Sequence, residues 1–314
     1  MVTSADVQAA HQRIAPHLHQ TPVLRSRSLN QLVQAELHFK CENFQRAGSF
    51  KFRGATNTLL QLSEADLAKG VATTSSGNHG AALALAASLK NARVTVVMPH
   101  NTPQVKVENV RRYGGEIVFC ESSHGSREGT LAELVERTGA TVVHPYNDER
   151  IIAGQGTAAW ELLTECPDLD TLVSPVSGGG LLSGTLLAAQ GKNPEISVYG
   201  AEPQEADDTI RSLKAGHIVQ NATVNTIADG LRAQIGTLTF PIVQKHVTEV
   251  IPVSEEEIIA ALRMLWERLK IVVEPSSSVT LAAVLKAPES FNGKKIGLLL
   301  SGGNANLDAL PWIR

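Results

Sequence analysis

The strongest constraint on the fold is an alternation of short β-branched or apolar runs with longer segments of helical period, which begins near residue 70. Such an alternation is typical of a parallel sheet covered by helices. In the first half of the chain it predicts strands at 71–74, 93–98, 116–119 and 141–143, with helices at 78–89, 103–113 and 126–137. A second set has predicted strands at 171–176, 198–201, 249–252 and 295–300, with helices at 180–189, 255–269 and 278–285. The pattern therefore predicts the α/β class, with two layers of parallel sheet.

The chain has 314 residues, more than the usual size of a single compact core, so two units that share a cleft are expected. The first set of elements lies within residues 72–147, which we predict to be a small mobile domain. Residues 1–71 and 148–314 would then form the larger domain. Because the sequence has no internal repeat and no low-complexity linker, the two units are expected to pack tightly.

The composition excludes several classes of partner. A formal net charge of −3 and a pI near 6.4 offer no basic face for nucleic acid. No stretch approaches the ~18 apolar residues of a membrane span, and the N-terminus lacks the apolar core of a secretory signal. The three cysteines, Cys41, Cys120 and Cys166, are too few and too unpatterned for a disulfide framework or a paired zinc site. We therefore expect a cytoplasmic protein with reduced thiols, whose partner is a small soluble molecule.

One lysine stands in an unusual local setting. The segment 48–55 has the sequence GSFKFRGA and places Lys51 between Phe50 and Phe52. Partial desolvation between aromatic rings lowers the pKa of an amine and frees it to condense with a carbonyl group. A surface lysine whose stem covers the rings is the alternative interpretation.

Three further segments at the ends of predicted strands are rich in glycine and serine. Residues 74–80 (TSSGNHG) precede a predicted helix, where backbone N–H groups attract an anion such as an α-carboxylate. Residues 176–184 (VSGGGLLSG) contain three consecutive glycines, which can form a nest of N–H donors for a phosphate. Residues 300–304 (LSGGN) end the last predicted strand. Ligands of open parallel sheets bind at the carboxyl ends of strands, so these segments are expected to meet in one crevice. A helix cap, a flexible turn and a strand-ending turn are the respective alternatives.

Together these segments resemble the serine racemase and threonine (serine) dehydratase family of pyridoxal-phosphate enzymes, which has the tryptophan-synthase β-subunit type of fold. Further motifs of that family occur in family order: AGQGT at 153–157, AEP at 201–203, IADG at 227–230 and VEP at 273–275. The resemblance covers essentially the whole chain. It implies a two-domain fold with pyridoxal 5'-phosphate in the cleft between the domains, a small amino-acid substrate and a homodimer.

The resemblance also implies roles for individual positions. Lys51 would hold the cofactor as a Schiff base and serve as the catalytic base, with Phe50 packed on the cofactor ring. Asn78 would bond the phenolic oxygen of the ring, and Ser301 would face its nitrogen. The phosphate would be bound by Ser177, Gly178, Gly179, Gly180 and Leu181. The substrate would be bound by the loop residues Ser75, Ser76, Gly77 and His79. Ser177 stands where the family often has a fourth glycine, which leaves the geometry of its side chain open.

The implied reaction is a β-elimination of water from L-serine or L-threonine. The resulting enamine then hydrolyses to a 2-oxo acid and ammonia. Ser76 matches the second catalytic residue of racemases in the family, opposite Lys51, so serine racemisation is expected as a side activity. One alternative is 3-hydroxyaspartate ammonia-lyase, or racemase, as the main activity, and another is a non-catalytic pyridoxal-phosphate-binding protein. A β-replacement enzyme of the same fold would have a different lysine motif and another carboxylate loop.

Two further positions bear on the choice of substrate. Arg127, in the predicted helix 126–137, and Tyr146, near the return to the larger domain, would close over the substrate. An arginine binds a second carboxylate through paired hydrogen bonds and a tyrosine hydroxyl adds a donor, which would favour 3-hydroxyaspartate. Alternatively, Arg127 pairs with Glu128 or Glu133 on the helix surface and Tyr146 only packs in the hinge.

The resemblance implies a divalent-cation site as well, formed by the carboxylates of Glu202 and Asp208 and the backbone carbonyl of Ala206. Hard cations such as Mg²⁺, Mn²⁺ or Ca²⁺ prefer oxygen ligands completed by water. An acidic surface loop over residues 202–208 is the alternative. Because the chain ends at Arg314, the regulatory domain of biosynthetic threonine dehydratases is not expected.

Overall fold

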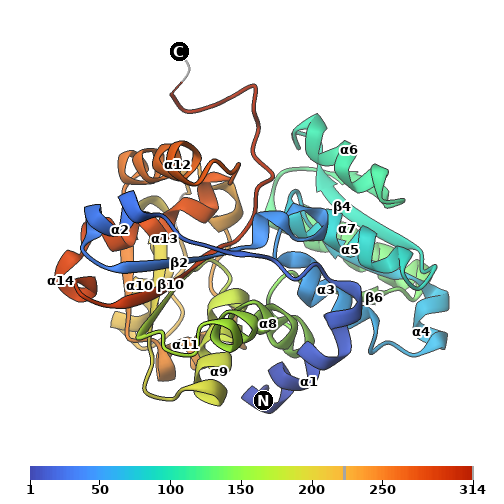
Figure 1. Cartoon of the computed structure of the whole chain (residues 1–314). Helices are drawn as coiled ribbons and strands as arrows, with labels where there is room; N and C mark the ends of the chain where they lie inside the picture. Colours follow the sequence, from blue (N-terminus) through green and yellow to red (C-terminus); the bar gives the residue numbers. More distant parts are fainter. Residues whose placement is uncertain (222–223, 313–314) are drawn as a thin grey trace.

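The computed structural model describes residues 1–221 and 224–312 and contains two α/β units, each built on one sheet (Figure 1). The larger sheet has six strands in the order β1-β2-β10-β7-β8-β9, and the smaller has four in the order β5-β4-β3-β6. Paired strands run parallel, apart from the antiparallel pair β1 and β2 in the described chain. The structure therefore confirms the predicted fold class of parallel sheets flanked by helices.

The strands and helices predicted from the alternation are present, with ends shifted by three residues or fewer. The strands are β1 (Val23–Leu24), β2 (Glu36–Cys41), β3 (Val71–Thr74), β4 (Val94–Pro99), β5 (Glu116–Cys120), β6 (Thr141–Val142), β7 (Thr171–Pro175), β8 (Ser197–Pro203), β9 (Glu249–Val253) and β10 (Lys295–Leu300). The α-helices are α1 (Ser4–Ile14), α2 (Arg27–Val33), α3 (Lys51–Leu59), α4 (Glu64–Lys69), α5 (Asn78–Ser88), α6 (Gln104–Arg112), α7 (His124–Thr138), α8 (Glu149–Glu165), α9 (Gly180–Lys192), α10 (Asp208–Ala215), α11 (Thr239–His246), α12 (Glu255–Leu269), α13 (Pro275–Lys286) and α14 (Pro288–Phe291). Short 3₁₀ helices are η1 (Ala15–His17), η2 (Glu42–Phe44), η3 (Arg46–Gly48), η4 (Gln204–Ala206) and η5 (Asp229–Leu231).

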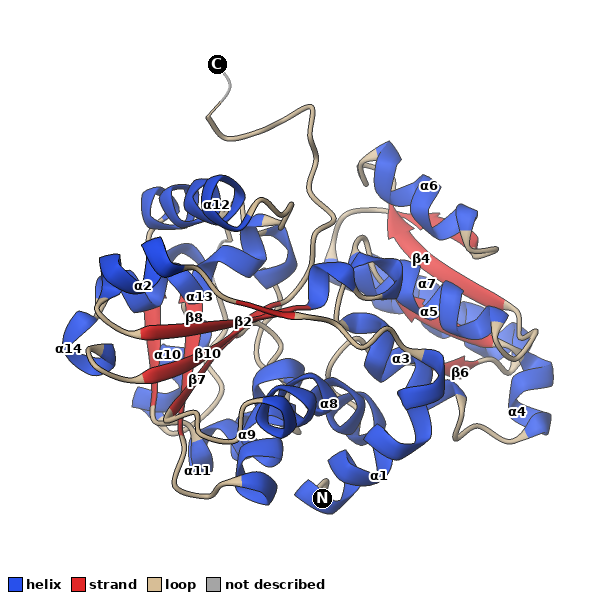
Figure 2. Cartoon of the chain, in the orientation of Figure 1, coloured by secondary structure: helices blue, strands red, loops and turns tan. Residues whose placement is uncertain are grey.

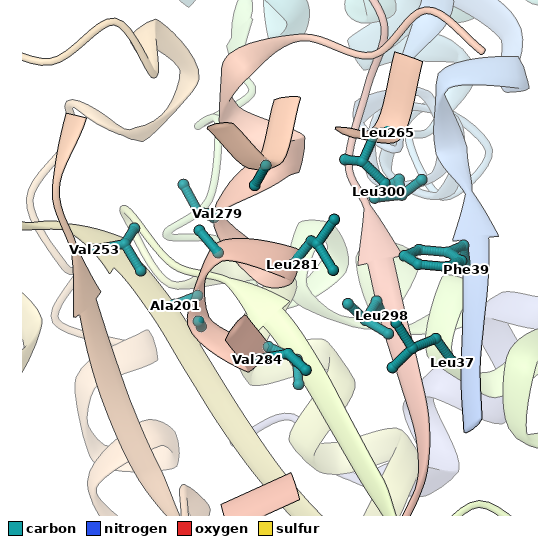
Figure 3. Close-up of a cluster of buried hydrophobic side chains, with 14 of the residues drawn as sticks. Leu37, Phe39, Ala201, Val253, Leu265, Val279, Leu281, Val284, Leu298 and Leu300 are labelled. Atoms are coloured by element: carbon teal, nitrogen blue, oxygen red, sulfur yellow. The ribbon is translucent and has the colours of Figure 1, made fainter. Parts of the chain in front are cut away.

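The larger sheet is covered by helices on both faces, which explains why its central strands are continuous apolar runs. In β10, Leu298 and Leu300 belong to a core that includes α12 and α13, whereas Leu299 belongs to a core that includes α8 and α9. Figure 3 shows the first core, in which Leu37 and Phe39 of β2 lie beside the β10 leucines. Because successive side chains of a strand point to opposite faces, one strand anchors both helical layers.

The first 70 residues contain elements that the alternation does not predict. Strand β2 has the buried polar residues His38 and Lys40, which conceal its apolar pattern. After α3 and α4 the chain builds the smaller sheet, and it returns to the larger one through α8 (Figure 2). The strands of the smaller sheet lie between residues 71 and 142, whereas the domain limits 72–147 stay a prediction.

Glycines allow α3, α8 and α9 to approach one another closely. A Cβ on Gly154 of α8 would lie 2.6 Å from the Cα of Gly54 in α3. A Cβ on Gly184 of α9 would lie 2.4 Å from the backbone nitrogen of Gly156 in α8. Since no side chain fits at these crossings, the AGQGT motif serves helix packing, and its glycines also explain why α8 has a weak helix signal.

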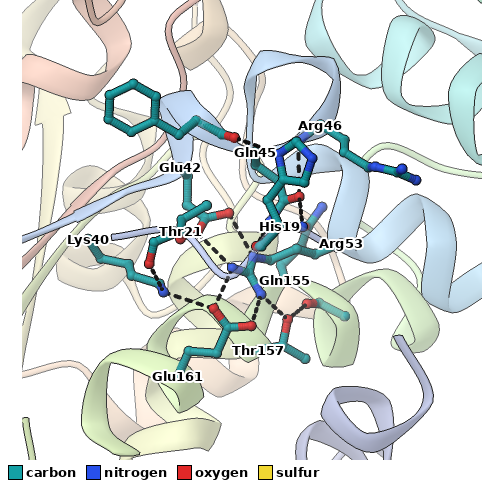
Figure 4. Close-up of polar contacts among 12 residues, drawn as sticks. His19, Thr21, Lys40, Glu42, Gln45, Arg46, Arg53, Gln155, Thr157 and Glu161 are labelled. Carbon is teal, nitrogen blue, oxygen red and sulfur yellow. Dashed lines mark hydrogen bonds and ion pairs between the residues drawn. The ribbon is translucent and has the colours of Figure 1, made fainter. Parts of the chain in front are cut away.

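A buried ionic cluster joins α3 to the larger sheet and to α8 (Figure 4). The guanidinium of Arg53, which is fully buried, donates to Glu42 at 2.7 and 2.8 Å and to Glu161 at 2.7 Å through each of two nitrogens. The ammonium of Lys40 in β2 lies 2.8 Å from Glu161. Removing one partner of a buried ion pair leaves an uncompensated charge, so this cluster holds α3 in place. The position of Lys51, the first residue of α3, depends on it.

No helix within the described ranges is long and apolar enough to cross a membrane. Cys41, Cys120 and Cys166 lie in the described part of the chain, where all of them are buried and free.

Candidate active site

Lys51 lies beside the carboxyl end of β10. The backbone nitrogen of Phe50 donates to the carbonyl oxygen of Ser301 at 3.0 Å. The segments 48–55 and 300–304, which are far apart in the sequence, therefore meet as the sequence predicts.

The amine of Lys51 has a partly buried position. Its Nζ donates to the carbonyl oxygen of Pro145 at 2.9 Å and lies 5.1 Å from the centroid of the Phe50 ring. Burial lowers the pKa of Lys51 to about 8, although the nearby carboxylate of Glu274 opposes this shift. A substantial fraction of the amine is therefore neutral near pH 8, and the neutral amine is the nucleophilic form.

The loop between β3 and α5 is held by the hydroxyl of Ser75. Its Oγ accepts hydrogen bonds from the backbone nitrogens of Gly77 and Gly80, at 3.2 and 3.0 Å. The hydroxyl of Ser75 therefore supports the first turn of α5, whose N-cap residue is Gly77, and Ser76 is half-buried next to it. This support is compatible with anion binding, because a helix N-terminus also favours a bound anion.

His79 is a neutral side chain in this loop. Its Nε2 lies 3.1 Å from the carbonyl oxygen of Val143, so Nε2 carries the proton and donates it. Burial, followed by the charge of Lys51, lowers the pKa of His79 to about 3. His79 therefore offers no positive charge to a substrate carboxylate.

Asn78 is bonded at both ends of its amide by residues to which the sequence analysis gives no role. Its Nδ2 donates to the two carboxylate oxygens of Glu274 at 2.9 and 3.0 Å, and its Oδ1 accepts from Asn304 at 2.9 Å. Burial, followed by the charge of Asp229, raises the pKa of Glu274 to about 7. Glu274 and Asn304 stand in the VEP and LSGGN motifs, and this place is the one sequence feature that marks them. The sequence alone does not reveal what these motifs do.

Ser301 is buried, and its Oγ lies 3.2 Å from the Oγ of Ser277 in α13. Ser277 also donates to the carbonyl oxygen of Gly302 at 2.7 Å and accepts from its nitrogen at 2.8 Å. Ser277 thus fixes the turn that carries Ser301. Nothing in the sequence distinguishes Ser277 from the serines on either side of it.

The glycine segment, residues 178–180, connects β7 to α9 and is closely covered. Gly179 has a φ of +86°, which glycine adopts without strain. A Cβ on Gly178 would lie 2.3 Å from the ring of Tyr146, and a Cβ on Gly179 would lie 2.7 Å from the hydroxyl of Thr239. No larger residue fits at either position. The backbone N–H groups in the first turn of α9 lack partners within the helix, so this segment can bind an anion.

Tyr146 lies against this glycine segment. Its ring also packs edge-on against His144, with the two ring centroids 4.5 Å apart. Burial, followed by the charges of Asp208 and Glu128, raises the pKa of Tyr146, so its hydroxyl stays protonated. Glu128 belongs to the first part of α7.

Arg127 lies in that first part of α7 and is half-buried. Its Nε is buried without a hydrogen-bond partner among the residues that the structure describes. A surface ion pair through Nε would require a hydrogen bond to Glu128 or Glu133, and Nε makes neither bond. A guanidinium nitrogen in this state suits a ligand that brings an acceptor.

The residues proposed to bind a cation lie at the end of β8, in η4 and at the start of α10. Glu202 and Asp208 are only 0% and 1% exposed, so an acidic surface loop does not describe them. Oε1 of Glu202 accepts from the backbone nitrogen of Ile210 at 2.8 Å, whereas its buried Oε2 has no partner in the described chain. Burial, with a further contribution from the charge of Asp208, raises the pKa of Glu202 to about 8. The described residues contain no group of three or more His, Cys, Asp or Glu side chains suited to a metal, and the third predicted ligand, Ala206, would act through its backbone.

A chain of contacts thus joins the predicted segments into one site. Lys51 contacts the carbonyl of Pro145, and the next residue, Tyr146, covers the glycine segment. The turn after β10 contacts both α3 and Asn78. The site therefore lies at the carboxyl ends of strands from both sheets, where open parallel sheets bind ligands.

Comparison with known proteins identifies the family. Residues 14–302 match the family described as pyridoxal-phosphate dependent enzyme. The chain belongs to this family. A β-hydroxyaspartate dehydratase from Paracoccus denitrificans is 51% identical over 310 residues, which are 99% of this chain and 98% of that protein. An L-threo-3-hydroxyaspartate ammonia-lyase from Saccharomyces cerevisiae is 43% identical, covering 97% of this chain and 94% of that protein. A crystal structure of serine racemase from Dictyostelium discoideum has a TM-score of 0.93 and 46% identity, covering 98% of this chain and 99% of that chain.

These findings confirm the family resemblance predicted from the motifs. The chain is a pyridoxal-phosphate-dependent enzyme of the dehydratase and racemase type, and its substrates are small hydroxy amino acids.

The residues of the site fit pyridoxal phosphate. The first turn of α9, which begins at Gly180, presents backbone N–H groups that have no partner within the helix, as a phosphate requires. Lys51 offers an amine of lowered pKa to the aldehyde, and Ser301 offers a buried neutral hydroxyl. The chemistry of the donors therefore agrees with the cofactor of the family.

Proposed function

We propose that the enzyme eliminates water from 3-hydroxyaspartate, after which hydrolysis of the resulting enamine releases oxaloacetate and ammonia. L-serine and L-threonine would be poorer substrates. The observation that carries this preference is Arg127, whose buried Nε has no partner in the described chain. A β-carboxylate would supply the missing acceptor through a charge-assisted hydrogen bond. The 51% identity with a β-hydroxyaspartate dehydratase supports the same choice over serine dehydration as the main activity.

In this proposal, Lys51 would hold the cofactor, and its Nζ, when free, would take the α-proton of the substrate. Its lowered pKa keeps part of the amine unprotonated and able to act as a base. Pyridoxal phosphate, when bound, supplies the electron sink for the bond that breaks at the α-carbon. Ser301 would present a neutral hydroxyl and no negative charge to the nitrogen of the cofactor ring, which would favour loss of the β-hydroxyl.

The remaining side chains would hold and orient the cofactor and the substrate. Asn78, fixed by Glu274 and Asn304, would bond the phenolic oxygen of the cofactor ring, and Phe50 would pack on that ring. The capped loop with Ser75, Ser76 and Gly77 would receive the α-carboxylate through its N–H groups and hydroxyls.

A substrate panel tests the main proposal. We expect kcat/KM for 3-hydroxyaspartate to exceed that for L-serine by at least about tenfold, as one charge-assisted bond to the β-carboxylate would give. Release of 2-oxo acid is measured for the threo and erythro forms of L-3-hydroxyaspartate, for L-serine and for L-threonine under the same conditions. Equal or higher kcat/KM with serine would refute the preference and leave a general serine and threonine dehydratase.

We also propose serine racemisation as a minor activity, because Ser76 is half-buried in the substrate loop and carries a hydroxyl suited to proton transfer. Ser76→Ala should reduce the formation of D-serine from L-serine more than it reduces elimination. Chiral chromatography of the products measures both. An equal loss of the two activities would show that Ser76 only supports the loop.

Two further properties belong to this proposal. A divalent cation would bind at Glu202, Asp208 and the carbonyl of Ala206, where Oε2 of Glu202 is buried without a partner in the described residues.

Two copies of the chain would form a homodimer, consistent with the exposed apolar side chains of Phe44 and Val272, each 45% exposed. Light scattering of the purified protein measures the oligomeric state.

A further inference from the structure

A short segment that follows η5 and ends at Thr239, the first residue of α11, lies directly on the glycine segment. We call residues 233–239 the strap. At one end of the strap, Ser177 donates from its Oγ to the carbonyl oxygen of Ala233 at 2.9 Å and accepts from the nitrogen of the same residue at 2.9 Å. The side chain at 177 is thus used to hold the strap, and a fourth glycine at this position would lack both bonds.

At the other end, Thr239 holds the peptide group between Gly178 and Gly179. Its Oγ1 donates to the carbonyl oxygen of Gly178 at 2.7 Å. The same carbonyl also accepts from the nitrogen of Gly236 at 3.2 Å. Both donors come from the strap, so this carbonyl is fixed from one side.

Fixing the carbonyl also fixes the next N–H group. In a trans peptide the C=O and the following N–H point in opposite directions. With the oxygen of Gly178 turned toward the strap, the N–H of Gly179 is turned away from it. Position 179 also accepts no side chain, because a Cβ there would lie 2.7 Å from the Thr239 hydroxyl.

We propose that Thr239 and Ser177 are positioning residues for the phosphate of the cofactor. They act through the main chain of the glycine segment and set the directions of the N–H groups that bind the phosphate. The proposal rests on the assignment of this segment as the phosphate site. It gives Ser177 an indirect role, in place of the direct contact that the family resemblance implies.

The strap has other attachments that should keep it folded when one hydroxyl is removed. The nitrogen of Ile235 donates to Oδ2 of Asp208 at 2.8 Å, and the nitrogen of Leu238 donates to Oδ1 of Asn147 at 2.8 Å. A variant that lacks only the Thr239 hydroxyl is therefore expected to retain the path of the strap. It would lose the strongest restraint on the Gly178 carbonyl.

The test compares Thr239→Val, which has the same shape but no hydroxyl, with Thr239→Ser, which keeps the hydroxyl. Pyridoxal phosphate and pyridoxal, which lacks the phosphate, are the two probes. Each purified holoenzyme is depleted of cofactor and titrated, and binding is followed by visible absorbance. We expect Thr239→Val to raise the Kd of pyridoxal phosphate about tenfold, equivalent to about 1.4 kcal/mol, and to leave the Kd of pyridoxal unchanged. Thr239→Ser should bind both probes as the unaltered protein does.

Two outcomes would overturn the proposal: an unchanged Kd for pyridoxal phosphate in Thr239→Val, or an equal weakening for both probes. If Thr239→Val fails to fold, Ser177→Ala decides, because it removes the bonds at the other end of the strap. The same selective loss for the phosphorylated probe is expected there. If the unaltered protein binds pyridoxal as tightly as pyridoxal phosphate, the chain has no phosphate site and the assignment of this segment fails as well.

Discussion

The chemistry of the site depends first on the protonation of Lys51. Because its pKa lies at about 8, where an exposed lysine has about 10.4, the neutral amine becomes abundant two pH units earlier than on the surface. The rate at which cofactor-free protein captures pyridoxal phosphate should therefore rise about tenfold per pH unit up to pH ~8 and then level off. Stopped-flow absorbance measures this rate. A rate that keeps rising to pH 10 would contradict the lowered pKa, and Lys51→Ala should show neither capture nor release of 2-oxo acid.

A second residue-scale prediction concerns Arg127. Arg127→Ala should lower kcat/KM for 3-hydroxyaspartate by about tenfold or more beyond its effect on serine, because a charge-assisted bond contributes about 1.5–3 kcal/mol. Arg127→Lys is the matched control, because it keeps the positive charge and loses the paired hydrogen-bond geometry. Its kcat/KM for 3-hydroxyaspartate should lie between those of the unaltered protein and Arg127→Ala. Steady-state kinetics with both substrates decides. A parallel fall for serine and 3-hydroxyaspartate would remove Arg127 from substrate choice.

The sequence predicts the reactive residues of the site better than their supports. Lys51, Asn78 and Ser301, which we propose as the reactive residues, stand in motifs whose residue types imply chemistry, so a single sequence selects them as candidates. Glu274, Ser277 and Thr239 act through contacts with residues far away in the chain, and their local sequence does not indicate those contacts. Long-range packing, which decides such pairs, has no local signature.

At the scale of elements, apolar strands are likewise predicted better than elements that carry buried charges or interior glycines. Strands covered on both faces, such as β7 and β10, are apolar runs and are predicted nearly to the residue. Strand β2 carries buried charges, and α8 carries two interior glycines, so both depart from the usual pattern. The reason is the same in each case: these elements form the junction between α3, β2 and α8, where ion pairs and close helix crossings replace apolar packing.

This junction makes a prediction about stability. Burial opposes ionisation of Glu161, but hydrogen bonds and charges from Arg53 and Lys40 outweigh it and lower the pKa of Glu161 to about 2. A carboxylate with a lowered pKa contributes stability that is full above its unfolded pKa, about 4.3, and is lost as the pH falls through that value toward 2. Glu161→Gln should therefore be less stable by about 3–5 kcal/mol at neutral pH and lose less stability on acidification.

Urea unfolding at several pH values measures this difference. Glu165→Gln, on the exposed end of the same helix, is the control and should stay within about 0.5 kcal/mol of the unaltered protein. If Glu161→Gln shows the same acid dependence as the control, the ionic cluster does not stabilise the ionised form of Glu161.

At the scale of the whole molecule, the two sheets meet through contacts made by short connecting segments. Asn78 at the start of α5 reaches the turn after β10, and the segment before α8 covers the glycine segment. The strand alternation predicts both sheets, and the rule that ligands bind at carboxyl ends of strands predicts their common crevice. Neither the alternation nor this rule predicts how the two sheets are oriented relative to each other, because these few side-chain and main-chain contacts set that orientation.

The last prediction concerns the cation proposed at the end of β8, which would join β8, α10 and the strap through Glu202, Asp208 and Ile235. A cation that binds only the folded chain stabilises it, by about 2.7 kcal/mol at a concentration 100 times its Kd. Protein treated with EDTA should therefore gain thermal stability when Mg²⁺ or Mn²⁺ is added, as measured by calorimetry.

Glu202→Gln should abolish this response and keep the metal-free protein folded. The variant replaces a buried carboxylate by a neutral group of the same shape, and one oxygen of that carboxylate has no partner in the described chain. Glu205→Gln, an exposed neighbour, is the control and should respond to the cation as the unaltered protein does. A cation response that persists in Glu202→Gln would place the cation elsewhere. If the unaltered protein has no response at all, the buried carboxylates of this loop have a purely structural role.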